Sequence, residues 1–268
     1  MFRAGKKSLL SGSRRTTAWV EKWAESVLCT SLRLRTVVFV AMLALVVPAC
    51  QSGPAPPPKI VLVFMDISGS VRDFTVYRDS WAKILNGLTD GDRIVLARIS
   101  AETLTQFRPV LDRELPGFHP LTDNKLRHEK QRKQIQQELA QALDQALAAP
   151  RSSKTDILHT LTLAEKIFHD EKRKRVLVLV SDMLEDSEEY NFERLQLTDD
   201  FARRVIAEQK KKGRLPDLDG AKVYVAGASA KSANKALDVQ QFWLAYCKEA
   251  SADLAPQNYG PALMNFEK

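Results

Sequence analysis

The sequence has few of the residues on which disulfides and nitrogen or sulfur metal sites depend. Its 268 residues include three cysteines and four histidines. Cys247 is the only cysteine after residue 50, so that part of the chain cannot form an internal disulfide, and we interpret Cys247 as a small core residue. The histidines lack the spacing of metal ligands, which favours surface or boundary positions for His119, His128, His159 and His169.

The motifs of several enzyme classes are also missing. The sequence contains no Gly-x-x-x-x-Gly-Lys-Ser/Thr phosphate loop, no Gly-x-Ser-x-Gly nucleophile turn and no His-Glu-x-x-His zinc motif. These absences exclude the nucleotide hydrolases, serine hydrolases and zinc proteases that depend on those motifs.

A charge excess is missing from most of the chain, although the whole sequence carries a formal charge of +7. Residues 1–50 hold eight basic and two acidic side chains, which leaves 32 basic and 31 acidic residues for 51–268. Domains that bind nucleic acid normally show a strong basic excess. We therefore predict no nucleic-acid partner.

No apolar run reaches the length of a membrane-spanning helix. The uncharged apolar stretch 36–49 follows two arginines and is shorter than the roughly 20 residues that a helix needs to cross a bilayer. This layout is typical of a secretory signal, and a permanent membrane span is the weaker alternative. We therefore expect residues 1–50 to be a basic region followed by an export signal.

The end of that stretch, Val47-Pro48-Ala49-Cys50, resembles the lipobox of bacterial lipoproteins, with Pro48 as a departure from it. The resemblance implies that Cys50 is lipidated and that the chain is anchored in the cell envelope. Gln51 stands where an aspartate would retain a lipoprotein at the inner membrane. In a Gram-negative host, the periplasmic face of the outer membrane is therefore favoured. Residues 51–58 are rich in proline, which predicts a short, extended tether.

From Lys59 onward, short apolar runs alternate with longer amphipathic segments, which predicts one α/β domain over 59–268. We expect a doubly wound, mostly parallel central sheet with helices on both faces. The predicted strands are 59–65, 94–99, 103–110, 174–180 and 221–227, and the predicted helices are 76–88, 123–149, 155–168, 192–211 and 234–250.

Two of these predicted helices carry further expectations. The helix at about 123–149 is interpreted as an insertion that presents an apolar stripe of Leu126, Ile135, Leu139, Leu143 and Leu147. Trp81 and Trp243 lie on apolar helix faces, which predicts that both are core residues.

Oxygen-bearing side chains follow the apolar strands at three places. Asp66, Ser68 and Ser70 follow the first strand, Thr155 precedes a helix, and Asp182 follows the strand 174–180. The carboxyl ends of parallel strands meet at one edge of the sheet, where ligands bind. An all-oxygen set selects Mg²⁺ or Mn²⁺ before zinc, so we predict a hard divalent metal site.

This pattern resembles the metal-ion-dependent adhesion site of von Willebrand factor A-type domains, written Asp-x-Ser-x-Ser, then Thr, then Asp. The resemblance covers roughly Lys59 to Lys248, and Lys154 departs from the glycine that often precedes the threonine. It implies a non-catalytic module in which a bound ion offers one position to an Asp or Glu of a partner protein. The implied metal ligands are Asp66, Ser68, Ser70, Thr155 and Asp182.

Three other interpretations stay open at this point. Asp66-Ile67-Ser68 is compatible with a simple helix N-cap, although a cap does not account for Thr155 and Asp182. A phosphatase of the haloacid dehalogenase type also places an aspartate after its first strand, but Ser68 stands where that chemistry needs a second acid. A structural lipoprotein with a vestigial metal site is the third, with Lys154 as its sequence hint. Asp156 is expected to lie in the first turn of a helix and not to be a ligand.

Overall fold

The computed structural model describes residues 56–69, 74–99 and 107–267. Residues 56–268 form a compact unit of their own, which begins close to the predicted domain boundary. Cys50, Ser70 and the export signal lie outside the described residues. No helix within the described part of the chain is long and apolar enough to span a bilayer.

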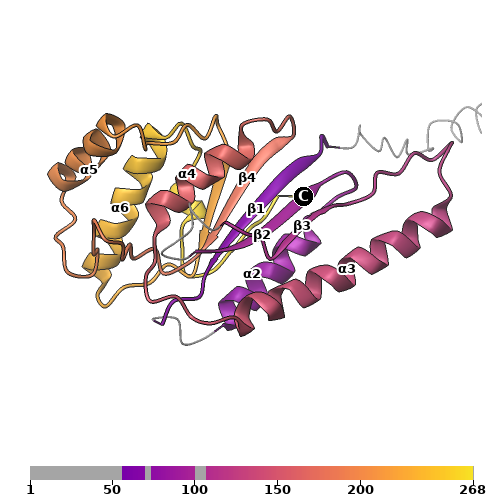
Figure 1. Ribbon diagram of the computed structural model, residues 1–268, viewed down its shortest axis with the longest axis horizontal. Coiled ribbons are helices and arrows are strands. Elements are labelled where there is room, and N and C mark those ends of the chain that lie inside the picture. Colours follow the sequence, from indigo (N-terminus) through magenta and orange to yellow (C-terminus); the bar gives the residue numbers. More distant parts are fainter. Residues whose placement is uncertain (1–55, 70–73, 100–106, 268) are drawn as a thin grey trace, which may run out of the picture. The chain divides into compact units, whose positions relative to one another are not determined.

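A five-stranded sheet forms the centre of this unit, with the strand order β3-β2-β1-β4-β5 (Figure 1). Only the edge strand β3 runs antiparallel to its neighbour. The predicted mostly parallel sheet is therefore confirmed. The strands are β1 (Lys59–Asp66), β2 (Arg93–Ile99), β3 (Leu111–Glu114), β4 (Lys174–Val180) and β5 (Lys222–Ala226).

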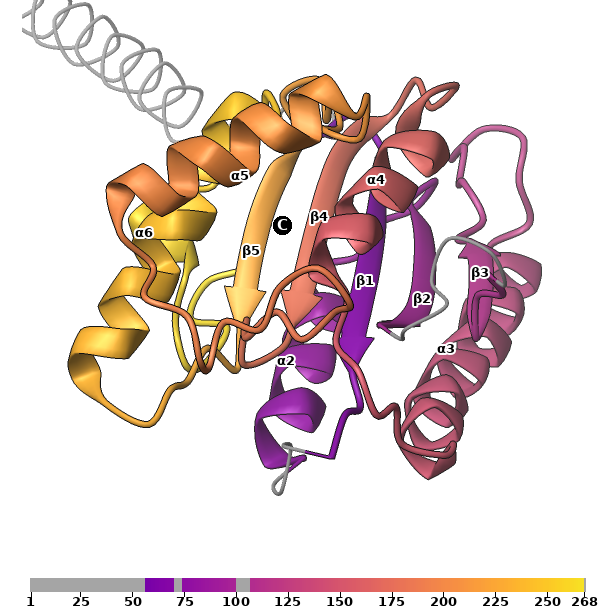
Figure 2. The ribbon, with the colours of Figure 1, turned by 60° about the vertical axis from the view of Figure 1, so that its left-hand side comes forward.

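Helices cover both faces of the sheet (Figure 2). Every residue of β1 is buried, and its alternating side chains enter two separate cores. Ile60, Leu62 and Phe64 pack on one face with α4 (Ile157–Phe168), α5 (Asp199–Lys211) and α6 (Ala233–Glu249). Val61, Val63 and Met65 pack on the other face with α2 (Thr75–Asn86) and α3 (Lys125–Ala148). This is the doubly wound arrangement that the sequence predicts.

Two predicted elements are wrong in position. Of the predicted strand 103–110, only residues 107–110 are described, and they do not form a strand. The edge strand begins at Leu111 instead. Pro109 has no N–H to give to the sheet, which disfavours a strand through it. The predicted helix 192–211 begins only at Asp199, because Thr198 accepts a hydrogen bond from the Phe201 amide and caps the helix there.

The predicted stripe of α3 holds in its second half and fails in its first. Leu139 and Leu143 are buried, whereas Leu126 is 77% exposed. Each helical residue turns the chain by about 100°, so Leu126, nine residues before Ile135, points to the opposite side of the helix. The predicted core positions of Trp81, Trp243 and Cys247 are confirmed.

Candidate functional site

The site predicted from the sequence lies where the chain leaves β1 and β4. These two strands are parallel neighbours at the centre of the sheet. The chain passes from β1 to α2 on one face and from β4 to α5 on the other. A topological switch point of this kind opens a crevice beyond the carboxyl ends of the strands, where α/β proteins bind their ligands.

Asp66, the last residue of β1, is fully buried and bonded to neutral donors. Its Oδ1 atom accepts a hydrogen bond of 2.8 Å from the Ser68 amide, and its Oδ2 atom accepts one of 3.0 Å from the Ser181 hydroxyl. The Thr155 hydroxyl lies 3.4 and 3.5 Å from the two carboxylate oxygens. Among the described residues, no lysine, arginine or histidine forms an ion pair with Asp66.

Short backbone bridges bring the loop of Thr155 to the two strand ends. Ser68 pairs with Ser152 in a parallel bridge, and Thr155 pairs with Asp186 in an antiparallel one. In the second bridge the Thr155 amide donates to the Asp186 carbonyl at 3.0 Å, and the Asp186 amide donates back at 2.8 Å. These bridges hold Thr155 between the loop after β1 and the loop after β4.

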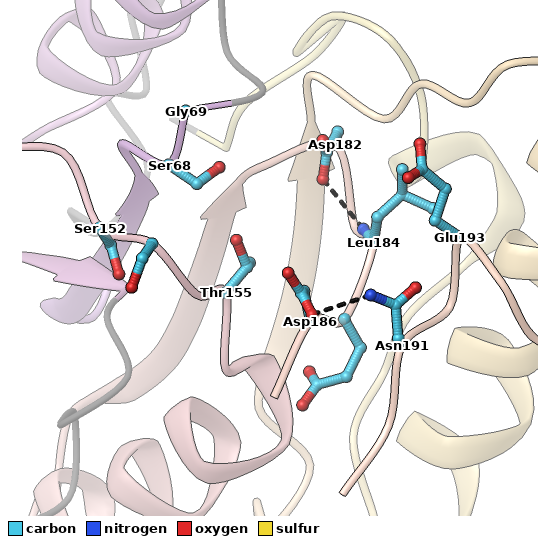
Figure 3. A pocket seen from close by; sticks show the side chains of 11 residues that line it. Ser68, Gly69, Ser152, Thr155, Asp182, Leu184, Asp186, Asn191 and Glu193 are labelled. Carbon is cyan, nitrogen blue, oxygen red and sulfur yellow. Dashed lines mark hydrogen bonds between the residues drawn. The ribbon is translucent and has the colours of Figure 1, made fainter. Parts of the chain in front are cut away.

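The three loops enclose a cavity of about 250 Å³. Figure 3 shows the hydroxyls of Ser68 and Thr155 and the carboxylate of Asp182 directed toward the same space. Asp182 is partly exposed, and one of its oxygens accepts a hydrogen bond from the Leu184 amide at 3.0 Å. The cavity is lined by Ser68, Gly69, Ser152, Ser153, Thr155, Asp182, Leu184, Glu185, Asp186, Asn191 and Glu193.

The turn after Asp182 is held in an uncommon backbone conformation. Met183 has a φ of 67°, in the left-handed region that side chains other than glycine rarely adopt. Its amide donates to the Ser181 hydroxyl at 3.0 Å, and its carbonyl accepts the Trp243 indole N–H at 2.9 Å. Strained positions of this kind persist only where the surroundings fix them. Here the contacts of Met183 with Ser181 and Trp243 fix the turn that directs Asp182.

Ser181 is a site residue that the sequence reasoning missed. It is buried, and its hydroxyl bridges the Asp66 carboxylate and the Met183 amide. The signal was available in the sequence, because Ser181 follows the last residue of β4 and directly precedes Asp182. A hydroxyl at the end of a buried strand needs a partner, and a carboxylate ends the neighbouring strand.

Tyr77 of α2 was also missed as a neighbour of the site. Burial raises the pKa of its phenol above the ordinary value, and the nearby carboxylates of Asp66 and Asp182 raise it further. The Tyr77 hydroxyl is buried without a hydrogen-bond partner among the described residues. Asp66 and Asp182 therefore both lie close enough to Tyr77 to act electrostatically on its buried phenol.

Glu185 is a third buried acid beside the cavity. One of its oxygens accepts hydrogen bonds from the amides of Ile157 and Leu158, at 2.7 and 3.2 Å, in the first turn of α4. Burial raises the pKa of Glu185 to about 8, and the nearby Asp156 carboxylate adds to the rise. Asp156 was expected in the first turn of α4 and instead lies one position before it, as the N-cap, where its side chain accepts a hydrogen bond from the His159 amide.

Lys154, which departs from the family pattern, is directed to the rim of the cavity. Its ammonium lies 3.4 Å from an oxygen of Asp186, and the same oxygen accepts a hydrogen bond of 2.9 Å from Asn191. The Lys154 charge is thus balanced by Asp186.

Of the predicted ligands, the structure brings Asp66, Ser68, Thr155 and Asp182 to one edge of the sheet, and Ser70 lies outside the described residues. No group of three or more His, Cys, Asp or Glu side chains that would hold a metal ion is found in the described part of the chain. A site of two carboxylates completed by hydroxyls is a different donor set. The oxygens present here fit a hard cation, since they include two acids and two neutral hydroxyls.

No family model matches the sequence, and no curated protein matches it either. The fold is similar to several solved structures at low sequence identity. The manganese-loaded TRAP protein of Plasmodium vivax is 12% identical, with a TM-score of 0.34 over 69% of this chain and 63% of that one. A von Willebrand factor type A protein from Catenulispora acidiphila is 12% identical, with a TM-score of 0.34 over 72% of this chain and 43% of that one.

A third similar structure is the pilus adhesin SpaC from Lactobacillus rhamnosus GG in an open conformation. It is 14% identical, with a TM-score of 0.43 over 77% of this chain and 28% of that one. This chain therefore spans less than two thirds of each of these three proteins. The von Willebrand factor A type that the motif resembles is represented among them. The α/β fold class itself follows from the strand order and the two helical layers.

Proposed function

We propose that this chain is a non-catalytic protein-binding module that uses Mg²⁺ or Mn²⁺ to hold an acidic side chain of a partner protein. The observation that carries the proposal is the Asp66 carboxylate, which is buried beside a polar cavity and bonded to neutral donors. Burying an unpaired charge is costly unless a counter-charge approaches it. A divalent cation in the adjoining cavity would supply that counter-charge.

The proposed ligand set consists of Asp66, Ser68, Ser70, Thr155 and Asp182. Hydroxyls leave the charge of a dication uncancelled, whereas each carboxylate cancels one unit of it. With two acids at most in contact, the ion keeps an affinity for an anionic group from outside. Bound there, the ion would supply electrostatic attraction for the carboxylate of a partner. Ser181, Met183 and Trp243 would position Asp66 and Asp182 through the contacts described above.

The proposed location is the cell envelope, with the domain held by a lipid at Cys50 and a short tether over 51–58. The support is the sequence alone: an apolar stretch preceded by arginines and ended by Val47-Pro48-Ala49-Cys50. Pro56, Pro57 and Pro58, the part of this segment among the described residues, are exposed. In this arrangement the partner would be another protein of the envelope.

Calorimetric titration of the purified chain with Mg²⁺ and Mn²⁺ tests the metal site. We expect binding by the parent chain and none by Asp66→Ala. The matched control is Asp156→Asn, which removes one buried charge near the site but keeps a good N-cap for α4, and it should still bind metal. Equal binding by the parent and Asp66→Ala would overturn the assignment.

Capture of partners from an envelope extract tests the binding function itself. We expect the parent chain and Asp156→Asn to retain a protein partner in Mg²⁺ and to release it in excess chelator, whereas Asp66→Ala retains none. Hydrolysis of a generic aryl phosphate should not rise above background with any of the three chains. A partner held equally in chelator would contradict the proposed metal bridge.

A further inference from the structure

The tether enters the domain at the amino-terminal ends of the parallel strands, and the candidate site lies at their carboxyl ends. We call the side where the tether enters the tether edge. Pro58 precedes the first residue of β1, and it lies against Gly91, whose added Cβ would stand 3.6 Å from the Pro58 Cβ. Asp90, next to Gly91, forms an ion pair with Arg132 of α3, and the Nε2 atom of His128 in the same helix lies 3.4 Å from its carboxylate. The amino-terminal half of α3 is therefore attached to the same edge as the tether.

This half of α3 and the turn before it expose leucines together with basic side chains. Leu121 is 90% exposed and Leu126 is 77% exposed, the highest values among the large apolar side chains of the described residues. Arg127, Lys130 and Lys133 are exposed on the same stretch. We name these five residues, Leu121, Leu126, Arg127, Lys130 and Lys133, the tether-edge patch.

Helix geometry places three members of this patch on one line. Leu126, Lys130 and Lys133 are separated by four and three residues, so they share one side of α3. The core side of the helix carries His128, Arg132 and Ile135, which are partly buried, and Leu139, which is buried. Leu126 thus points away from the domain core, and its exposure is not explained by packing within this chain.

The surrounding ion pairs do not balance all of the positive charge of the patch. Between residues 125 and 133 the chain has five lysines and arginines against the single acid Glu129. Arg132 is balanced by Asp90, and Lys125 lies 3.9 Å from Glu129. Among the described residues, no ion pair involves Arg127, Lys130 or Lys133.

We propose that the tether-edge patch docks on an anionic phospholipid surface and so holds the candidate metal site facing away from the membrane. Basic side chains attract anionic headgroups, and leucines among them enter the boundary of the acyl region. A protein or nucleic-acid surface would also complement the cations, but the tether joins the domain at this same edge. The inference uses the proposed membrane anchoring only to bring the patch to the bilayer.

Two new tryptophans report which edge of the domain meets the membrane. The full chain is mixed with vesicles of phosphatidylglycerol and brominated phosphatidylcholine, and the quenching of Leu126→Trp is compared with that of Leu237→Trp. Leu237 is the matched control, because it is 51% exposed and lines a hollow next to Asp182 at the opposite edge. The fluorescence of the parent chain, which has four tryptophans, is subtracted from both.

We expect Leu126→Trp to be quenched on the order of twofold more than Leu237→Trp, because bromine reaches only side chains at the depth of the acyl boundary. Vesicles of phosphatidylcholine alone should abolish the difference. Equal quenching of the two tryptophans, or no quenching of either, would overturn the proposal.

Charge variants separate the patch from a general effect of net charge. Lys130→Gln with Lys133→Gln should weaken docking on the order of 25-fold, at roughly fivefold for each cation lost. The control double variant, Arg203→Gln with Arg204→Gln, removes the same charge near the start of α5, on the side of the candidate site, and should leave docking unchanged. An equal effect of both pairs would contradict a specific patch.

Docking on the membrane and binding of the metal ion can be tested independently of each other. Asp66→Ala should dock as the parent does while it loses metal binding, and Lys130→Gln with Lys133→Gln should bind metal as the parent does. Failure of docking with intact metal binding rejects the patch alone, and the reverse result rejects the metal site alone.

Discussion

Two fully buried aspartates lie at opposite ends of the central parallel strands, and they differ in the groups that bind them. Asp66 ends β1, and its carboxylate accepts hydrogen bonds from an amide and from hydroxyls. Asp92 precedes β2 at the other edge, and its carboxylate lies 2.8 Å from the ammonium of Lys59. Asp92 also accepts from the amides of Lys59 and Thr89, both at 2.8 Å.

The difference separates a structural acid from one that is available to a ligand. The charge of Asp92 is balanced by Lys59, whose ammonium also donates to the Gly87 carbonyl at 2.9 Å, so this pair ties β1 to the turns before β2. The charge of Asp66 is met by dipoles alone among the described residues. A cation bound at that edge would therefore gain more from Asp66 than one bound near Asp92.

The largest expected effect is on the structural side of this comparison. Asp92→Asn removes one partner of a buried ion pair and leaves the Lys59 ammonium without a counter-charge. We expect the free energy of unfolding to fall by about 3–5 kcal/mol, measured by chemical denaturation. The loss should be the same with and without Mg²⁺. A loss below about 1 kcal/mol, as for a surface ion pair, would show that Lys59 and Asp92 do not act as a buried pair.

Glu185 sharpens the comparison because it too is buried and forms no ion pair among the described residues, yet its burial favours the protonated form. Its folded-state pKa of about 8 lies above the ordinary value of 4.5, so the folded chain holds this proton more tightly than the unfolded chain. The contribution to stability is complete below pH 4.5 and is lost as the pH rises through about 8.

Glu185→Gln tests this pH dependence, because the amide imitates the protonated acid. The parent chain should lose a few kcal/mol of unfolding free energy between pH 5 and pH 9, and the variant should lose less. Denaturation curves at several pH values measure the difference. Parallel pH profiles for the two chains would mean that Glu185 is ionised in the folded state across this range.

Asp66→Asn reverses the expectation for Asp92→Asn. The substitution removes a buried charge that no described cation balances, so stability without metal should stay equal or rise by about 1 kcal/mol. The parent chain should be stabilised by Mg²⁺ through preferential binding to the folded state, and the variant should not be. Thermal unfolding with and without Mg²⁺ checks both statements. A strong loss of stability without metal would place Asp66 in the same structural class as Asp92.

The fold could be predicted from the sequence wherever burial dictates the residue pattern. The strand 59–65 was predicted because a run of apolar and β-branched residues suits a strand covered on both sides. The edge strand β3 was misplaced because Leu111–Glu114 is short, largely exposed and mostly charged, so no apolar pattern marks it. The start of α5 was misplaced because Phe192, which is buried against aromatic side chains, imitates a helical apolar position.

In the candidate site, only the residues that belong to a recognisable sequence motif could be predicted. Asp66, Ser68 and Asp182 were predicted from strand ends and Thr155 from its place before a helix, and the register of β1 with β4 brings Asp66 next to the residues after Val180. Tyr77 and Glu185 could not be ranked from sequence, and Ser181 was marked only by its position between β4 and Asp182. Their importance comes from tertiary contacts with Asp66, with Asp182 and with the first turn of α4.

Lys154→Ala is expected to give the smallest effect, and it tests the cavity rim. The Lys154 and Asp186 side chains are each 40% exposed, so their ion pair should contribute less than about 1 kcal/mol to folding. Removal of a positive charge from the rim should strengthen Mg²⁺ binding by no more than roughly fivefold, since solvent screens the interaction. Titration calorimetry at two salt concentrations measures this change, which should shrink as salt is added. Weaker binding in the variant would instead show that Lys154 positions the Thr155 loop through Asp186, because that loop is bridged to Asp186 by backbone hydrogen bonds.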